Sequence, residues 1–139
     1  MTTAKEQRRG RRILVIEDED DMRTLMRDLL DLAGYDVELA ADGQEGIERI
    51  EAEAPDLVLL DLLMPRVDGW GVLERLRGRR EPPPVIVLTG TGDPETLARC
   101  LDEGAALAFG KPLAFGELLN ACEALTLRRV RKASSDGGA

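Results

Sequence analysis

The chain has 139 residues, of which 43% are hydrophobic and 33% are charged, so its length and composition are those of one globular domain. A formal net charge of −8 argues against nucleic acid as a direct partner, because phosphate binding needs clustered positive charge. No apolar stretch approaches the length of a membrane span and the amino-terminal residues lack a secretory signal, so we expect a cytoplasmic protein without membrane contact.

The absence of histidine and the presence of only two cysteines exclude several kinds of site. The absence of histidine excludes histidine-based acid–base catalysis, histidine metal sites and a role for this chain as a phosphohistidine donor. Cys100 and Cys122 are too few for a disulfide framework and lack the spacing of metal ligands, so we expect two reduced, partly buried thiols.

Short apolar runs predict a parallel sheet. Three continuous runs, at 13–16, 57–60 and 85–88, are typical of central strands that are buried on both faces. The segment 35–40 alternates between apolar and polar residues, which indicates a strand at the sheet edge. The run at 106–109 predicts a weaker fifth strand.

Segments with helical spacing of apolar residues separate these strands. The first contains Met22 and Met26 and ends at Gly34, a typical C-cap residue. Further helices are predicted at about 43–53, 68–79, 94–103 and 114–131.

Five strands, each followed by a helix, predict an α/β fold with an open, doubly wound, five-stranded parallel sheet, since five units are too few to close a barrel. We expect residues 11–132 to form this domain. A disordered basic tail is expected at 1–10 and a second disordered tail at 133–139.

Charged and polar residues follow four of the predicted strands. Glu17 and Asp18 follow the first, Asp61 the third, Thr89 the fourth and Lys111 the fifth. Ligands of doubly wound sheets bind beyond the carboxyl ends of the strands, so these side chains should converge at one edge. Three carboxylates in one pocket need a cation, and hard oxygen ligands with room for water suit Mg²⁺.

This set of residues suits phosphoryl transfer. Asp61 would be the nucleophile, Lys111 would offset charge on the phosphoryl oxygens, and Thr89 would donate a hydrogen bond. Each residue alone has an ordinary structural explanation, as a helix cap, a turn former, a strand end or a strand exit. Together these explanations are improbable, and we expect a functional site.

The chain resembles the receiver domain of bacterial two-component response regulators, the CheY-like superfamily. The resemblance runs from about Arg12 to Val130 and rests on ILVIEDE, PDLVLLDLLMPRVDGW, VIVLTG and Lys111-Pro112. It implies a flavodoxin-like (βα)5 fold with strand order 2-1-3-4-5. It also implies a phosphorelay protein that is not an enzyme. Its only chemistry would be to take a phosphoryl group onto itself and to lose that group slowly.

The resemblance assigns roles to individual residues. Asp61 would be phosphorylated by a sensor histidine kinase, a phosphotransfer protein or a small phosphodonor. Mg²⁺ would be held by Glu17, Asp18, Asp61 and the backbone carbonyl of Leu63. Thr89 and Lys111 would bind the phosphoryl group, and the peptide bond from Lys111 to Pro112 would be cis.

One position departs from the family pattern, and two others bear on how long the phosphoryl group lasts. An aromatic residue usually stands three residues before the lysine, where this chain has Ala108 followed by Phe109. Strand alternation predicts that Phe109 points to the opposite face, whereas a one-residue bulge would let it take the place of the missing aromatic. Leu63 is apolar and cannot position a hydrolytic water, and Thr91 could do so only weakly, so we expect slow loss of the phosphoryl group.

No recognisable effector follows the predicted domain. A complete chain would be a stand-alone receiver that acts by contact with a downstream protein, whereas a fragment would belong to a longer regulator with a separate effector. The sequence does not choose between the two, although its amino-terminal residues favour the first. Contact with a downstream protein, or pairing with a second copy, would use the surface formed by the segments 94–103, 106–109 and 114–131. The first helix, near Met22 and Met26, resembles the surface that docks a histidine kinase. The candidate output residues are Leu97, Cys100, Leu101, Ala108, Leu118 and Cys122.

Three other functions would use a similar fold or a similar set of residues. A haloacid-dehalogenase-type phosphatase needs a second aspartate two positions after the nucleophile, where this chain has Leu63. A dinucleotide-binding domain needs a glycine-rich turn after the first strand, where this chain is acidic. A pseudo-receiver that only docks partners would not need the intact set of acidic residues, Thr89 and Lys111, although Ala108 is compatible with it.

Overall fold

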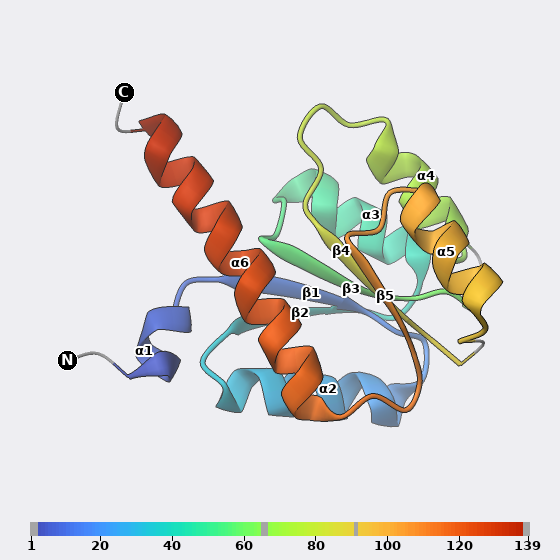
Figure 1. Ribbon diagram of the computed structural model, residues 1–139, viewed down its shortest axis with the longest axis horizontal. Coiled ribbons are helices and arrows are strands. Elements are labelled where there is room, and N and C mark those ends of the chain that lie inside the picture. The colour runs from blue at the N-terminus through green and yellow to red at the C-terminus, as the bar shows by residue number, and fades with distance from the viewer. Residues whose placement is uncertain (1–2, 65–66, 91, 138–139) are drawn as a thin grey trace.

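The computed structural model describes residues 3–64, 67–90 and 92–137, with side chains up to Leu127. Five parallel strands form one sheet in the order β2-β1-β3-β4-β5, which confirms the predicted fold and strand order (Figure 1). The strands are β1 (Arg12–Ile16), β2 (Asp36–Ala40), β3 (Leu57–Asp61), β4 (Val85–Thr89) and β5 (Leu107–Gly110). The helices are α1 (Ala4–Arg8), α2 (Asp20–Leu32), α3 (Gly43–Ala52), α4 (Gly69–Arg77), α5 (Pro94–Asp102) and α6 (Phe115–Gly137).

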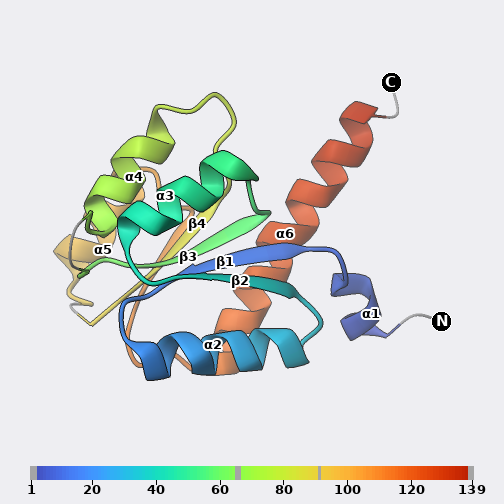
Figure 2. The same cartoon turned by 180° about the vertical axis from the view of Figure 1, so that it is seen from behind.

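Helices cover both faces of the sheet. Figures 1 and 2 view the molecule from opposite sides and show α6 across one face and α3 and α4 across the other. Between their end residues, the central strands are apolar at successive positions because successive side chains enter different cores. Val15 and Leu59 join the core beneath α2 and α6, whereas Leu14 and Leu60 join the core beneath α3, α4 and α5.

Aspartate caps fix where three of the helices begin. Asp42, Asp68 and Asp93 precede α3, α4 and α5, and each carboxylate accepts a hydrogen bond from the backbone N–H three residues later. At the other end of α2, Gly34 adopts a φ of 104°, which matches its predicted role in ending that helix.

The amino-terminal segment differs from the expected disordered tail over residues 1–10. Residues 4–8 form α1, and the Arg8 guanidinium lies 3.0 Å from the Glu123 carboxylate of α6 and 5.8 Å from the centre of the Tyr35 ring. A Cβ on Gly34 would lie 2.4 Å from the carbonyl oxygen of Lys5, so this helix is closely packed against the turn after α2. The partners of Arg8 are distant in sequence, and local composition could not reveal them.

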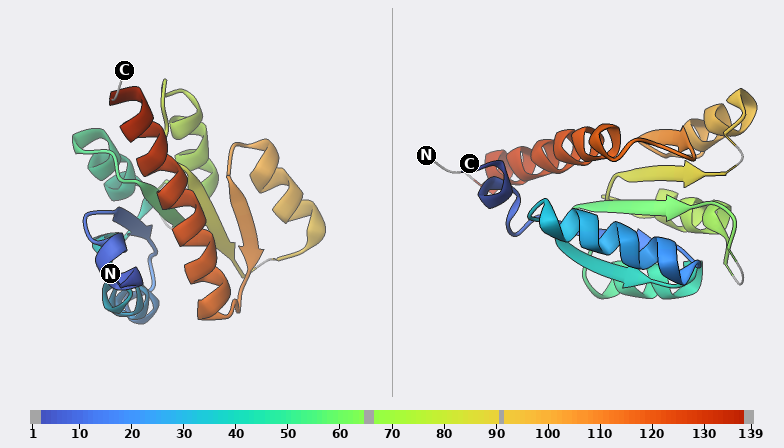
Figure 3. Two further views of the ribbon diagram at one scale, coloured as in Figure 1. Left: turned by 60° about the vertical axis from the view of Figure 1, so that its left-hand side comes forward. Right: turned by 90° about the horizontal axis from the view of Figure 1, so that it is seen from below.

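The carboxyl-terminal segment also differs from expectation. A tail was expected over 133–139, but α6 continues through Gly137, while residues 138 and 139 lie outside the described part of the chain. Figure 3 shows that α6 extends well past the sheet. Within the described residues, no helix is both long enough and apolar enough to cross a membrane.

The Arg8 contacts predict a stabilising role for the amino-terminal segment. Arg8→Gln should lower the free energy of unfolding by about 1 kcal/mol, because it removes a partly buried ion pair and a hydrogen bond to the Ala33 carbonyl. It should also speed amide exchange over residues 4–8. Denaturant titration and hydrogen exchange would measure both effects. Arg9→Gln, at an exposed neighbouring position, is the control and should change neither.

Candidate functional site

The candidate site lies at the carboxyl edge of the sheet. Glu17 immediately follows β1, and its backbone N–H donates to the Ala40 carbonyl at the end of β2. Asp61 is the last residue of β3. Lys111 follows β5, and its backbone N–H donates to the Thr89 carbonyl at the end of β4, at 2.8 Å. Each functional side chain therefore projects from a strand end that the sheet ladder holds in place.

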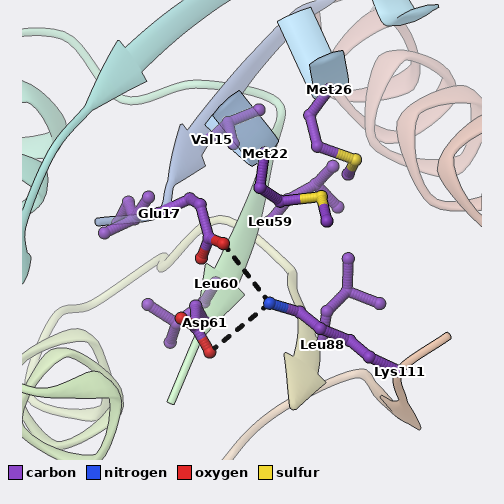
Figure 4. A pocket seen from close by; sticks show the side chains of 10 residues that line it. Val15, Glu17, Met22, Met26, Leu59, Leu60, Asp61, Leu88 and Lys111 are labelled. Atoms are coloured by element: carbon purple, nitrogen blue, oxygen red, sulfur yellow. Dashed lines mark hydrogen bonds and ion pairs between the residues drawn. The ribbon is translucent and has the colours of Figure 1, made fainter. Parts of the chain in front are cut away.

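Three carboxylates and one ammonium meet at this edge. One carboxylate oxygen from each of Glu17, Asp18 and Asp61 lies within 4.8 Å of the other two. The Lys111 Nζ is 3.4 Å from Glu17 Oε1 and 3.8 Å from Asp61 Oδ1. Figure 4 shows the ammonium between the two carboxylates. The structure therefore brings together four of the predicted side chains.

The surroundings of Glu17 oppose its negative charge. Glu17 is buried, at 4% exposure, and this burial, together with the neighbouring Asp61 carboxylate, raises its pKa to about 7. The Lys111 ammonium lowers the pKa and only partly offsets these effects. Among the described residues, the three carboxylates of this site therefore carry more negative charge than the Lys111 ammonium compensates.

Thr89 lies beside this cluster but belongs to the other face of the strand. It is buried at the end of β4, where its neighbour Leu88 lines a cavity of about 30 Å³ together with Glu17, Asp61 and Lys111. Side chains alternate along a strand, so Thr89 follows Val87 toward the side of α3, α4 and α5. The structure thus places Thr89 at the correct edge, next to the carboxylates but outside the lining of that cavity.

The remaining predicted positions are also located. The Leu63 side chain is 61% exposed, two residues beyond Asp61. Thr91 lies outside the described residues. The peptide bond from Lys111 to Pro112 is cis, as predicted. Ala108 packs against the core beneath α3, α4 and α5 and Phe109 packs against the opposite core, so Phe109 does not take the place of the missing aromatic.

The structure explains the Asp68-Gly69 part of the motif, whose role the sequence did not reveal. The Gly69 N–H donates to the Leu62 carbonyl at 2.8 Å. A Cβ on Gly69 would lie 2.5 Å from the Leu62 Cα and 2.8 Å from the Asp61 carbonyl oxygen. Only glycine lets the start of α4 pack this closely on the strand end that carries Asp61.

Two methionines of α2 also border the site. Met22 and Met26 line the small cavity above Asp61 and Lys111 (Figure 4). They also line a larger, mainly apolar groove of about 350 Å³ that continues along α2 to Phe115 and Leu118. Their helical spacing indicated a buried or docking face, but only the fold shows that this face adjoins the carboxylates.

The carboxylates fit a hard divalent cation. All three side-chain ligands are oxygens, as Mg²⁺ prefers. Glu17 Oε2 is buried and has no hydrogen-bond partner among the described residues, which is the expected condition of a ligand atom for a cation.

Comparison with known proteins gives a consistent result. Residues 13–123 match the model of the response regulator receiver domain. The chain is 40% identical over 128 residues to Response regulator MprA of Mycolicibacterium vanbaalenii, which covers 92% of this chain and 54% of that protein. It is 42% identical over 120 residues to the Mycobacterium tuberculosis MprA, covering 86% of this chain and 52% of that protein. The chain thus spans about half the length of these curated relatives.

Solved structures show the same likeness. The receiver domain of the Francisella response regulator 1452 has a TM-score of 0.82 and 27% identity, covering 86% of this chain and 98% of that one. The BeF3-activated N-terminal receiver domain of Klebsiella pneumoniae RstA has a TM-score of 0.78 and 30% identity, covering 83% of this chain and 97% of that one.

The raised pKa of Glu17 predicts a pH-dependent effect of Glu17→Gln on stability. The folded protein favours the protonated form of Glu17. The stability that Glu17 contributes is therefore fully present below its ordinary pKa of 4.5 and is lost as the pH rises through about 7. In chelator, the substitution should be nearly neutral at about pH 5 and should raise the free energy of unfolding by on the order of 1–3 kcal/mol at about pH 8. Denaturant titrations across this pH range would measure it.

The matched control is Glu48→Gln on the exposed face of α3, which should show no such trend. Addition of Mg²⁺ should then stabilise the native protein more than the Glu17→Gln variant. An effect of Glu17→Gln that is the same at every pH would contradict the argument.

Proposed function

Since the chain belongs to the response regulator receiver family of two-component signalling, we propose that Asp61 is the residue that accepts the phosphoryl group. The observation that carries this proposal is the position of its carboxylate. The side chain is 12% exposed at the mouth of the cavity, 3.8 Å from the Lys111 ammonium and within reach of two further acidic groups. Receiver domains are generally not enzymes in their own right, and the proposed chemistry is self-modification.

In the proposed reaction, an Asp61 carboxylate oxygen attacks the phosphorus atom of the donor. A new P–O bond forms as the bond from phosphorus to the donor breaks, and the donor leaves with that electron pair. With a histidine kinase or phosphotransfer protein, the bond that breaks is the P–N bond of phosphohistidine. Lys111 would keep its ammonium close enough to offset charge on the transferred group.

We propose that Mg²⁺ would be held by the carboxylates of Glu17, Asp18 and Asp61 and by the Leu63 carbonyl. When bound, the cation would neutralise charge on the phosphoryl oxygens. The three carboxylates already lie close together, and the excess of negative charge around Glu17 favours such a ligand. Because Asp18 is exposed, this side of the cluster is open to solvent.

Thr89 would bind the phosphoryl group once it is on Asp61. Asp61 is paired in register with Leu88, so Thr89 lies one residue further along the neighbouring strand. A group attached to the Asp61 carboxylate extends the side chain beyond the strand end, toward the level of Thr89. A small movement of the loop after β4 would let the Thr89 hydroxyl donate to a phosphoryl oxygen.

The apolar groove suggests where the phosphodonor binds. It runs along α2 and past Pro112 to Phe115, and it shares Met22, Met26 and Lys111 with the site. A helix of a histidine kinase or phosphotransfer protein laid in this groove would bring its phosphohistidine to Asp61. Output to a downstream protein, or pairing with a second copy, would use α5, β5 and α6, with no direct contact to nucleic acid.

The alternative functions are not favoured. A haloacid-dehalogenase-type phosphatase would need a proton donor at position 63, and the exposed Leu63 cannot supply a proton. A pseudo-receiver would have no use for the carboxylate cluster around Lys111.

Phosphorylation of Asp61 can be tested with acetyl phosphate and Mg²⁺. Intact-mass analysis should show a gain of one phosphoryl group in the native protein, because the carboxylate and its neighbours already lie together. Asp61→Asn should show none, and chelation of the metal should abolish the gain. Asp56→Asn, at a distant carboxylate that binds the Arg12 backbone, is the control and should leave the gain intact. An equal gain in Asp61→Asn would exclude Asp61 as the acceptor.

Leu63 predicts a long-lived phosphoryl group. Leu63→Gln should speed its loss, because an amide can orient a hydrolytic water where an apolar side chain cannot. The change should affect stability little, since the Leu63 side chain is exposed. The decay of the phosphorylated mass after removal of acetyl phosphate measures the rate, with Leu63→Met as the apolar control. Native decay within seconds would contradict this prediction.

A further inference from the structure

The face of the sheet that bears Thr89 lacks an aromatic residue on β5. Ala108, the β5 residue that packs on this side, carries only a methyl group. The chain has one Trp, one Tyr and two Phe, and Tyr35, Phe109 and Phe115 all pack with the opposite core. Trp70 alone packs on the Thr89 side. Any aromatic response to phosphorylation on this face therefore has to come from α4 rather than from β5.

Trp70 is closely joined to the strand end that carries Asp61. It follows Gly69, whose N–H binds the Leu62 carbonyl and whose Cα packs against the Leu62 backbone. The Asp68 side chain caps the same turn through the Gly71 N–H, at 3.0 Å. The hydrogen bond and this close packing attach the start of α4 directly to the backbone of Asp61 and Leu62.

Trp70 also contacts the helix that follows Thr89. The Arg99 guanidinium of α5 lies over the Trp70 ring, 4.1 Å from its centre. Arg99 is otherwise exposed and Trp70 is partly buried, so this contact lies at the surface between α4 and α5. Gly92, which lies between Thr89 and α5, packs closely on β5, since a Cβ on Gly92 would lie 2.6 Å from the Gly110 Cα. The two helices joined by this contact therefore each connect to one side of the phosphorylation site.

We infer that the contact of Trp70 with Arg99 is a conformational link that carries the phosphorylation state of Asp61 to α5. The inference rests on the proposed function of Asp61. Asp61 acts on α4 through Leu62 and Gly69, while Thr89 acts on α5 through the loop after β4. A cation–π contact at the surface is weak enough to rearrange when these two helices shift relative to one another. Trp70 thus responds where position 108 holds only a methyl group.

The test follows phosphorylation and α5 in the same sample. The native protein, Arg99→Gln and Arg75→Gln are incubated with acetyl phosphate and Mg²⁺. Intact mass gives the extent of phosphorylation, amide exchange over residues 94–102 reports on α5, and emission from the single tryptophan reports on the contact. Arg75→Gln is the charge-matched control, because Arg75 is on α4 but pairs with Glu51.

Phosphorylation should change both the exchange of α5 and the Trp70 emission in the native protein and in Arg75→Gln. In Arg99→Gln the mass gain should persist, while the change in α5 exchange should fall by about two- to fivefold, as expected for loss of one surface cation–π contact. An undiminished α5 response in Arg99→Gln with a normal mass gain would overturn the link alone. Absence of the mass gain in the native protein would remove the proposed function and the link with it.

Discussion

Repulsion among carboxylates is the constraint on which this site depends. The parallel sheet brings Glu17, Asp18 and Asp61 to one edge, and among the described residues Lys111 is the cation that pairs with the Glu17 and Asp61 carboxylates. Because Glu17 is buried, water cannot screen this repulsion fully, and its pKa rises toward neutrality. A divalent cation held by these carboxylates would offset this repulsion. The excess of negative charge therefore lowers the stability of the fold and at the same time favours the binding of a cation.

The alternation of side chains divides the site between two cores. Asp61 and Lys111 face the side of α2 and α6, where the methionines and the apolar groove lie. Thr89 and Ala108 face the side of α3, α4 and α5. In the proposed reaction, the donor would approach from one side of the sheet and Thr89 would respond on the other. The register of β3 and β4 places Thr89 one residue beyond Asp61 along the neighbouring strand.

The sequence predicted the sheet well because buried parallel strands are continuous apolar runs, and the residues that end them carry the chemistry. It also predicted the opposite orientations of Ala108 and Phe109, since alternation is a local rule. The amino-terminal helix was missed because Arg8 finds its partners at Ala33, Tyr35 and Glu123, far along the chain. For the same reason, the pairing of Trp70 with Arg99 has no local signature and becomes visible only when α4 and α5 are placed side by side.

The length of α6 carries its carboxyl-terminal part beyond the sheet (Figure 3). The helix is fastened to the body of the molecule near Cys122 and Thr126, which are buried, and near Glu123, which is tied to Arg8. From Glu123 to Gly137 its axis advances by roughly 20 Å, at about 1.5 Å per residue. A tilt of α6 by only a few degrees about these contacts would move its carboxyl-terminal end by about an ångström or more. A tilt of α6 that is too small to disturb the packing of the sheet would thus displace the end of the helix enough to alter its contacts with a bound protein.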